Sequence, residues 1–238
     1  MPTNNSISWK RISAEGATIV ISIILAFSID AWWDERQERQ DEIEILDRLQ
    51  SELSVNIERI DWVTENRRRK IAYAVELFDL IEEAQAQANA TVTVPTMMLM
   101  HLADSSTFEA DIPVLQGIIR SARLEIIENE EILAAIARWE SGLRNYTEVA
   151  LRERWNTDNR FIPSLSERGD TAHVLMRIGG PGALQADSDP NDVTTMRIDD
   201  RFKALVAERT ENARRSDSIL GEARRAAADA REIIATVK

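Results

Sequence analysis

The chain has 238 residues, 44% of them hydrophobic, so it can bury a packed core and does not have the composition of a disordered chain. Its 41 acidic and 29 basic side chains give a formal net charge of -12, which argues against nucleic acid and anionic lipid as generic partners. It contains no cysteine, which excludes disulfides, thiolate metal sites, cysteine nucleophiles and lipidation on cysteine.

Residues 12–33 form an apolar segment near the N-terminus that predicts a transmembrane helix. As a helix this segment would extend about 33 Å, close to the thickness of the hydrocarbon core of a bilayer. Tryptophans, which favour the membrane interface, flank it: Trp9 comes before it, and Trp32 and Trp33 close it. We therefore expect a single-pass anchor in the lipid bilayer, with residues 1–11 as a short tail.

The segment contains two carboxylates, and a cleaved signal peptide is the alternative interpretation. The uncharged run 16–29 is short enough for a signal, but Glu15 stands where a signal peptide is basic. Lys10 and Arg11 precede Glu15, and Arg11 shares a helix face with it, so we expect Glu15 to pair at the membrane boundary. Asp30, next to the tryptophan pair, is expected to reach interfacial water at the other boundary.

Small and polar residues recur every four positions along the same helix. Such a ridge lets a second helix approach closely and gives its hydroxyl groups partners. We therefore predict an interface with another membrane protein, or with a second copy of this chain, made by Ala14, Thr18, Ser22, Ala26 and Asp30. The alternative is that small residues are simply common in such spans.

Basic residues give the segment a weak orientation signal. Lys10, Arg11 and the terminal amine precede it, whereas Arg36 and Arg39 follow it among acidic residues, which count little in the positive-inside rule. We expect an anchor in a bacterial inner membrane, with the N-terminus inside and residues 34–238 in the periplasm.

The stretch after Trp33 contains no proline or glycine that would end the helix, so the membrane helix is expected to continue into water. Its heptad seam is apolar except near its middle, where Arg67 and Lys70 fall on it. The seam comprises Leu46, Leu49, Leu53, Asn56, Ile60, Val63, Arg67, Lys70, Ala74, Leu77 and Ile81.

Shorter elements are expected next. After two short helices, the second capped by Asp111, a long helix begins at the capping residue Asn129 and ends near Arg160 or Pro163. Residues 164–195 have the composition of a loop, and their GGPG sequence lacks the strand and the lysine of a nucleotide-binding loop.

Residues 196–236 are predicted to form one long alanine-rich helix. If this helix runs antiparallel to the first, Arg209 and Asn212 lie level with Arg67 and Lys70. The result would be a polar layer in an otherwise apolar bundle, either a ligand pocket or a device that fixes the helix register. The predicted seam comprises Ile198, Phe202, Leu205, Arg209, Asn212, Ser216, Ile219, Ala223, Ala226, Ala230, Ile233 and Val237.

The first third of the chain contains a glutamate, an apolar run, Ala-x-x-Ile-x-x-Trp, a charged stretch and Leu-x-x-x-Leu, at Glu15, Ala26, Ile29, Trp32, Leu49 and Leu53. In this it resembles a family of uncharacterised bacterial single-pass membrane proteins, and residues 108–139 are similar to the helical middle of that family. The resemblance implies an inner-membrane anchor and a helical domain. It implies no activity and carries over no functional residue.

The sequence lacks the residues of the usual catalytic chemistries, since its two histidines lie far apart and no nucleophile triad or metal-ligand spacing occurs. We therefore expect an all-α protein that is not an enzyme, needs no cofactor or metal, and does not bind nucleic acid. The leading hypothesis is a non-catalytic accessory or scaffold subunit that associates with another membrane protein. The alternative is a ligand-binding or sensory helical bundle that acts through a partner.

Overall fold

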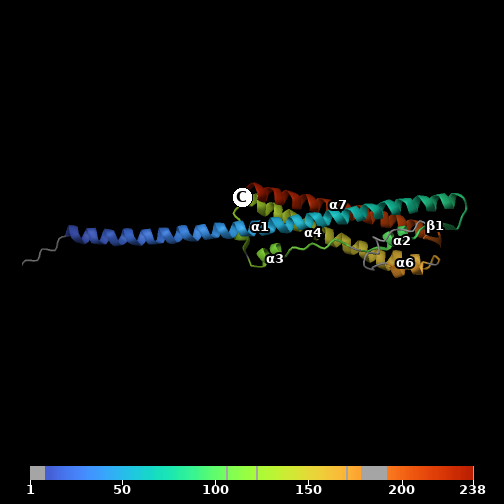
Figure 1. Ribbon diagram of the computed structural model, residues 1–238, viewed down its shortest axis with the longest axis horizontal. Helices are drawn as coiled ribbons and strands as arrows, with labels where there is room; N and C mark the ends of the chain where they lie inside the picture. The colour runs from blue at the N-terminus through green and yellow to red at the C-terminus, as the bar shows by residue number, and fades with distance from the viewer. Residues whose placement is uncertain (1–8, 106, 122, 170, 178–191, 238) are drawn as a thin grey trace, which may run out of the picture.

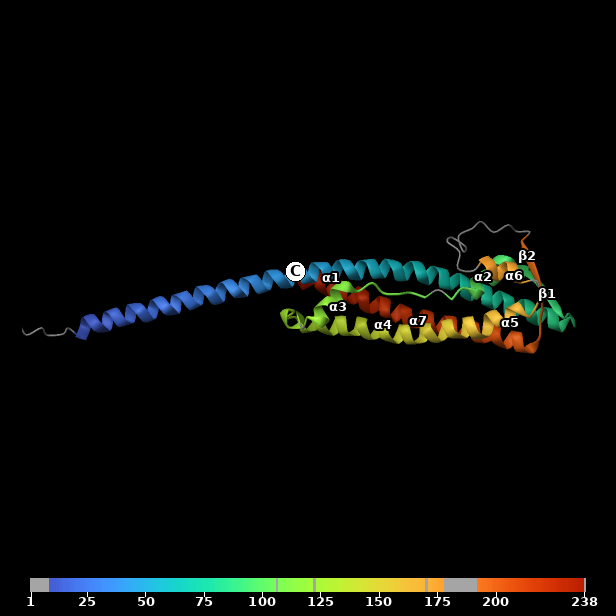
Figure 2. The ribbon, with the colours of Figure 1, turned by 90° about the horizontal axis from the view of Figure 1, so that it is seen from below.

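The computed structural model describes residues 9–105, 107–121, 123–169, 171–177 and 192–237; the side chains of residues 9–19, 123, 172, 175 and 177 lie outside the described part. Three long helices make a bundle: α1 (Trp9–Ala86), α4 (Glu130–Asn156) and α7 (Asp200–Val237). Helix α7 runs antiparallel to the other two and packs against both (Figures 1 and 2). The predicted helical fold is confirmed.

Helix α1 is much longer than the bundle. Its N-terminal arm, residues 9–40, extends alone beyond the other elements, and the end of α7 lies where α1 enters the bundle (Figure 1). All described side chains of the arm, from Val20 to Gln40, are exposed, and the first buried side chain after Val20 is that of Leu46. Within the described part of the chain, no helix is both long enough and apolar enough to cross a membrane.

A small two-stranded sheet and three short helices cover the end of the bundle that lies away from the arm. Two antiparallel strands, β1 (Thr91–Pro95) and β2 (Val193–Arg197), join there with α2 (Thr96–Ala103) and the short helices α5 (Ile162–Ser166) and α6 (Ala172–Arg177). The predicted loop over 164–195 is therefore wrong where it is described, since two short helices and a strand occupy part of it. Met196, the predicted start of the last helix, lies in β2 instead.

Helix α4 does not end where the sequence indicates. It continues through a π-helix, η2 (Thr157–Phe161), directly into α5. The wider π turn shifts the inward-facing positions, so that Phe161 and Leu165 are buried while Arg160 stays exposed. Asn129 caps α4 as predicted, because its side chain accepts hydrogen bonds from the backbone N–H groups of Glu131 and Ile132.

A connection on the side of the bundle links α2 to α3 (Pro113–Arg120) and the 3₁₀ turn η1 (Arg123–Ile126). Asp111 does not cap α3 as expected. Glu52 of α1 does so instead, since its carboxylate accepts hydrogen bonds from the N–H groups of Val114 and Leu115. The Asn56 side chain bonds both the N–H and the carbonyl of Asp111, at 3.0 and 2.7 Å. Two residues of α1 thus fix this connection.

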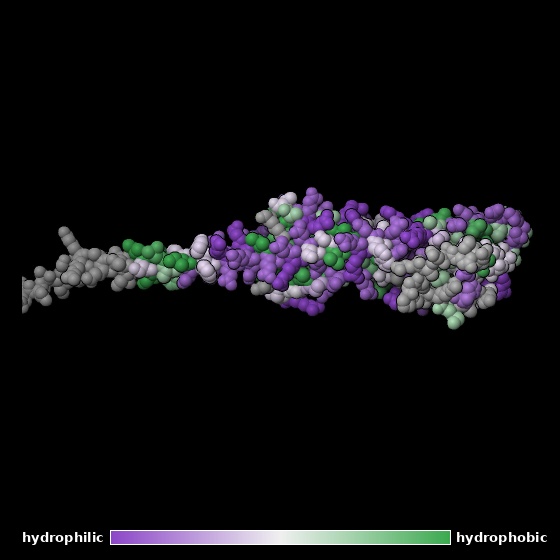
Figure 3. Space-filling view, in the orientation of Figure 1, coloured by the Kyte–Doolittle hydropathy of each residue, from purple (hydrophilic) through white to green (hydrophobic). Residues whose placement is uncertain are grey.

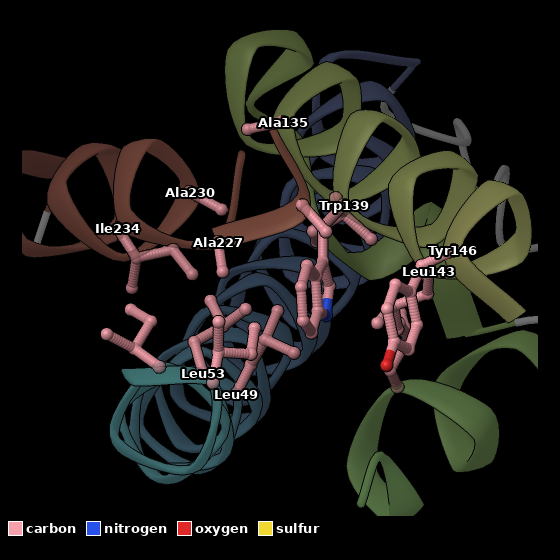
Figure 4. Close-up of a cluster of buried hydrophobic side chains, with 14 of the residues drawn as sticks. Leu49, Leu53, Ala135, Trp139, Leu143, Tyr146, Ala227, Ala230 and Ile234 are labelled. Atoms are coloured by element: carbon pink, nitrogen blue, oxygen red, sulfur yellow. The ribbon is translucent and has the colours of Figure 1, made fainter. Parts of the chain in front are cut away.

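The part of the bundle near the arm has a core of complementary sizes. Leucines of α1, Trp139 of α4 and small residues of α7 point toward one another (Figure 4). Gly142 of α4 lies so near α7 that an added Cβ would stand 3.1 Å from the Cα of Ala223. The bulky indole is therefore accommodated because the facing helix offers alanines: Ala223, Ala227 and Ala230.

The predicted seam of α1 is confirmed, since all of its residues are buried except the half-buried Val63. On α7, every second residue of the predicted seam, from Phe202 to Ala230, is buried as expected. Between them, the buried residue is the one that follows the predicted position. Ala213 is buried and Asn212 only half-buried. Because α7 packs against two helices rather than one, its buried face is rotated relative to a simple two-helix seam.

Candidate functional site: a buried charged layer

A layer of charged side chains divides the core into two apolar clusters. One cluster, nearer the arm, extends along α1 from Leu46 to Ile60, and the other begins at Ala74. Arg67 and Lys70 of α1 lie between them, and both are at least 97% buried. Ionised groups are rarely buried this deeply unless they are paired, so the layer is the most unusual feature of the bundle.

Glu153 of α4 is the central anion of the layer. Its Oε2 accepts a hydrogen bond from Arg67 Nη2 at 2.7 Å, and its Oε1 accepts one from Arg209 Nη1 at 2.9 Å. All three side chains are less than 5% exposed. One carboxylate therefore connects the three helices of the bundle through charge-assisted bonds.

The end of α2 provides further acceptors. The carbonyl of Asp104 accepts hydrogen bonds from Lys70 Nζ and from Arg209 Nη2, each at 2.8 Å, and the carbonyl of Leu102 accepts one from Arg209 Nε. The Asp104 carboxylate also lies 3.3 Å from Lys70 Nζ. These carbonyls lie at the C-terminal end of α2, where the negative end of the helix dipole favours the positive charges of Lys70 and Arg209.

Burial and neighbouring charges shift the ionisation of the layer in opposite directions. Burial opposes ionisation of Glu153, but Arg67, Arg209 and Lys70 outweigh it and keep the pKa of the carboxyl below its usual range. Burial, together with the like charge of Arg209, lowers the pKa of Lys70 to about 8, against the pull of Asp104. Glu153 is thus held as an anion, whereas Lys70 is poised to lose its proton in mildly basic solution.

The structure brings together three of the four residues predicted for the polar layer, namely Arg67, Lys70 and Arg209. It does not bring in Asn212, which is only half-buried and forms no hydrogen bond with the described residues of the layer. The carbonyl of its neighbour Ala213 instead accepts a hydrogen bond from Arg67 Nη2 at 3.1 Å.

Sequence reasoning missed the acceptors, Glu153 and Asp104. A signal for Glu153 exists, because it follows the buried Trp139 and Tyr146 at intervals of seven residues on α4. A heptad extended past the last apolar residue would have placed it in the core.

The N-terminal arm is the second candidate site. The large apolar side chains described on the arm are each at least half exposed and point in every direction around the helix: Val20, Ile21, Ile23, Ile24, Leu25, Phe27, Ile29, Trp32 and Trp33. They form the apolar band on the arm in Figure 3, ahead of a polar stretch. The ring of Trp32 lies 6.4 Å from that of Trp33, and the Arg36 guanidinium stands 5.8 Å from the Trp32 ring centre.

Of the residues predicted for the ridge on this arm, Ser22, Ala26 and Asp30 follow one another along its exposed surface. Ala14 and Thr18 lie where the helix is described but its side chains are not, and so do the predicted anchors Trp9, Lys10, Arg11 and Glu15. The interface and the anchors therefore stay predictions.

Within the described residues, no group of three histidine or acidic side chains is arranged to hold a metal ion. Comparison of the chain with protein-family models, with curated proteins and with solved structures finds no match. The resemblance to a family of single-pass membrane proteins stays a prediction.

Proposed function

We propose that this protein is a non-catalytic accessory or scaffold subunit, anchored in a bacterial inner membrane by the N-terminal part of α1. The observation that carries the proposal is the apolar surface that surrounds residues 20–33, which no other described element covers. Covering a large apolar side chain stabilises it by about 1.5–3 kcal/mol, so this surface needs lipid or a partner. Residues 20–33 would extend about 21 Å as a helix, and the predicted segment begins earlier, at residue 12.

The residues at the end of the apolar band, and those that follow it, support the same arrangement. The Trp32 and Trp33 pair, with Arg36 against Trp32, has the composition of a membrane interface. From Trp33 the helix continues unbroken over about 20 Å to Leu46, the first residue after this pair that is buried in the bundle. The bundle would therefore stand clear of the headgroups on a helical spacer, in a position to contact another protein.

Membrane anchoring is tested by alkaline extraction of native membranes. The wild-type chain should remain with the lipid, whereas Ile21→Arg combined with Ile24→Arg should release it, since each charge near a span centre costs about 2.5–3.5 kcal/mol. Val55→Arg with Trp62→Arg is the matched control, because these two apolar residues are exposed on the bundle. Release of the wild-type chain at high pH would show that the anchor proposal is wrong.

The orientation has its own test. The chain has no cysteine, so Ser51→Cys introduces a single thiol at an exposed position of the bundle. A maleimide that cannot cross the inner membrane should label this thiol in intact cells if the bundle lies in the periplasm. Labelling that requires lysis would place the bundle in the cytoplasm.

The accessory role predicts a partner that binds the ridge of small residues. Purification in a mild detergent, followed by mass determination, should recover a second membrane protein in a fixed ratio. Ser22→Leu with Ala26→Leu should abolish that recovery, because leucines prevent close helix approach, while Ile21→Leu on another face should not. Recovery of the chain alone would contradict the accessory role.

A ligand-binding or sensory bundle is the second candidate, favoured by the buried charged layer itself. Hydrogen-bonding groups grouped between two apolar clusters are the kind of site in which helical bundles hold small molecules. Native mass spectrometry of the purified chain should then detect a retained small molecule, and Glu153→Gln should reduce its occupancy.

A further inference from the structure

Arg67 has three N–H groups for which the described part of the protein offers no acceptor. Its Nη2 donates to Glu153 and to the carbonyl of Ala213, but neither Nε nor Nη1 has a hydrogen-bond partner there. The side chain is only 3% exposed, so bulk solvent does not reach these groups. A buried donor without an acceptor costs about 1–3 kcal/mol, which argues that something small accepts from it.

Asp217 of α7 has a buried acceptor atom that also lacks a hydrogen-bond partner among the described residues. This atom, Oδ1, lies 4.0 Å from Arg67 Nε. That distance is too long for a hydrogen bond, but it suits one small molecule bonded to both atoms. Burial raises the pKa of Asp217 even though Arg67 acts against it, which fits an ion pair that is not in direct contact.

A third unpaired group lies on the next residue of α7. The hydroxyl of Ser216 is fully buried and has no described partner. The hydroxyl of Ser216 lies near the phenol of Tyr146. Burial raises the pKa of that phenol, and Ser216 acts in the opposite direction. The two groups are nevertheless not arranged as a hydrogen bond.

The charges around the gap decide what the occupant can be. Arg67, Lys70 and Arg209 are balanced by Glu153 and by two carboxylates at the edge of the layer, those of Asp104 and Asp217. An anion would be repelled by Asp217 and a cation by Arg67, so the occupant is neutral. It must accept from Arg67 and donate to Asp217, and because these two atoms are 4.0 Å apart, one oxygen atom beside the line that joins them can lie within hydrogen-bond distance of both.

We propose that a water molecule is bound inside the layer, bridging Arg67 Nε to Asp217 Oδ1, with the Ser216 hydroxyl beside it. Buried waters of this kind are integral parts of folded proteins and make about three hydrogen bonds each. The site is independent of the membrane role, since it depends only on the packing of α1 against α7.

The test is nuclear magnetic resonance of the full chain in detergent, with the arginine side chains labelled with ¹⁵N. The Nε–H proton of Arg67 should show a cross peak at the water frequency, with the sign of a long-lived bound molecule in both the laboratory and the rotating frame. Absence of this cross peak in the wild-type chain would overturn the proposal.

Variants of α7 distinguish bound water from other sources of the signal. Asp217→Asn keeps an oxygen acceptor and should keep the cross peak, Asp217→Leu should abolish it, and Asp229→Leu, at an exposed acid of the same helix, should leave it unchanged. Ser216→Ala should also retain it, because the two main ligands remain. A cross peak that survives in Asp217→Leu, or that disappears with the Ser216 hydroxyl, would contradict a bridging water.

Discussion

Glu153 and Arg67, 86 positions apart in the chain, form an ion pair of 2.7 Å in which both side chains are less than 5% exposed. Such a pair is weak evidence for stability, because removing two charges from water costs nearly as much as their attraction returns. We attribute to the pair an effect on specificity instead, since this register of α1, α4 and α7 lets Glu153 pair with both Arg67 and Arg209. We interpret the layer as the element that fixes the alignment of the bundle.

Glu153→Gln should destabilise the bundle strongly. The substitution keeps the shape but leaves Arg67 and Arg209 buried without a counter-ion, and breaking such a pair typically costs about 3–5 kcal/mol. Urea unfolding of the full chain in detergent measures the change. Glu148→Gln, at an exposed position of the same helix, should change the free energy of unfolding by less than about 0.5 kcal/mol. Equal stability of the two variants would mean that the layer is hydrated and open.

Lys70 should make stability depend on pH in the basic range. Its pKa is about 8 in the folded protein against 10.5 unperturbed, so between these values the unfolded chain holds a proton that the folded chain has lost. Raising the pH through this window should therefore stabilise the wild-type chain relative to Lys70→Met, and the difference should become constant only at pH values well below the folded pKa of about 8. Unfolding of both chains at intervals from pH 7 to 10 measures it. A constant difference over the whole range would contradict the lowered pKa.

The sequence predicted the helices in which apolar residues recur at a regular spacing. It did not predict the features that depend on contacts between residues far apart in the chain. The seam of α1 was readable because apolar residues recur at heptad spacing over many turns. The pairing of β1 with β2 was not, because the strands are about a hundred residues apart and nothing local marks the partner of either one. The cap of α3 failed similarly, since its acceptor, Glu52, belongs to another helix.

The charged layer was predicted in part for the same reason. Arg67 and Arg209 fall on seams long enough to recognise, and an antiparallel arrangement makes them level. Asn212 was misplaced because the wider contact face of α7 is set by the third helix, α4, whose position no local pattern encodes. Glu153 was overlooked because acidic residues are normally assigned to the surface.

Asn56→Leu should loosen the connection between α2 and α3. Asn56 is fully buried and bonds both backbone groups of Asp111, so leucine would leave an N–H and a carbonyl without partners. We expect a loss of about 2 kcal/mol or more, and faster amide hydrogen exchange at Asp111 and along the start of α3. Asn66→Leu, at a half-buried position of the same helix, is the control. Unchanged exchange at Asp111 would show that the connection is held by other contacts.

The close packing of α4 on α7 makes Ala223 sensitive to size. Ala223 faces Gly142, where a Cβ added to the glycine would stand 3.2 Å from the alanine Cβ, so Ala223→Leu has no space for its added atoms. Overpacking of this kind costs about 1–3 kcal/mol, and Gly142→Ala should destabilise the same contact from the other side by a smaller amount. Thermal unfolding of the full chain measures both. Ala207→Leu, at an exposed position on α7, should be nearly neutral because leucine is also a good helix former. If Ala223→Leu is as stable as Ala207→Leu, then α4 and α7 are not packed as closely at Ala223 as the structure has them.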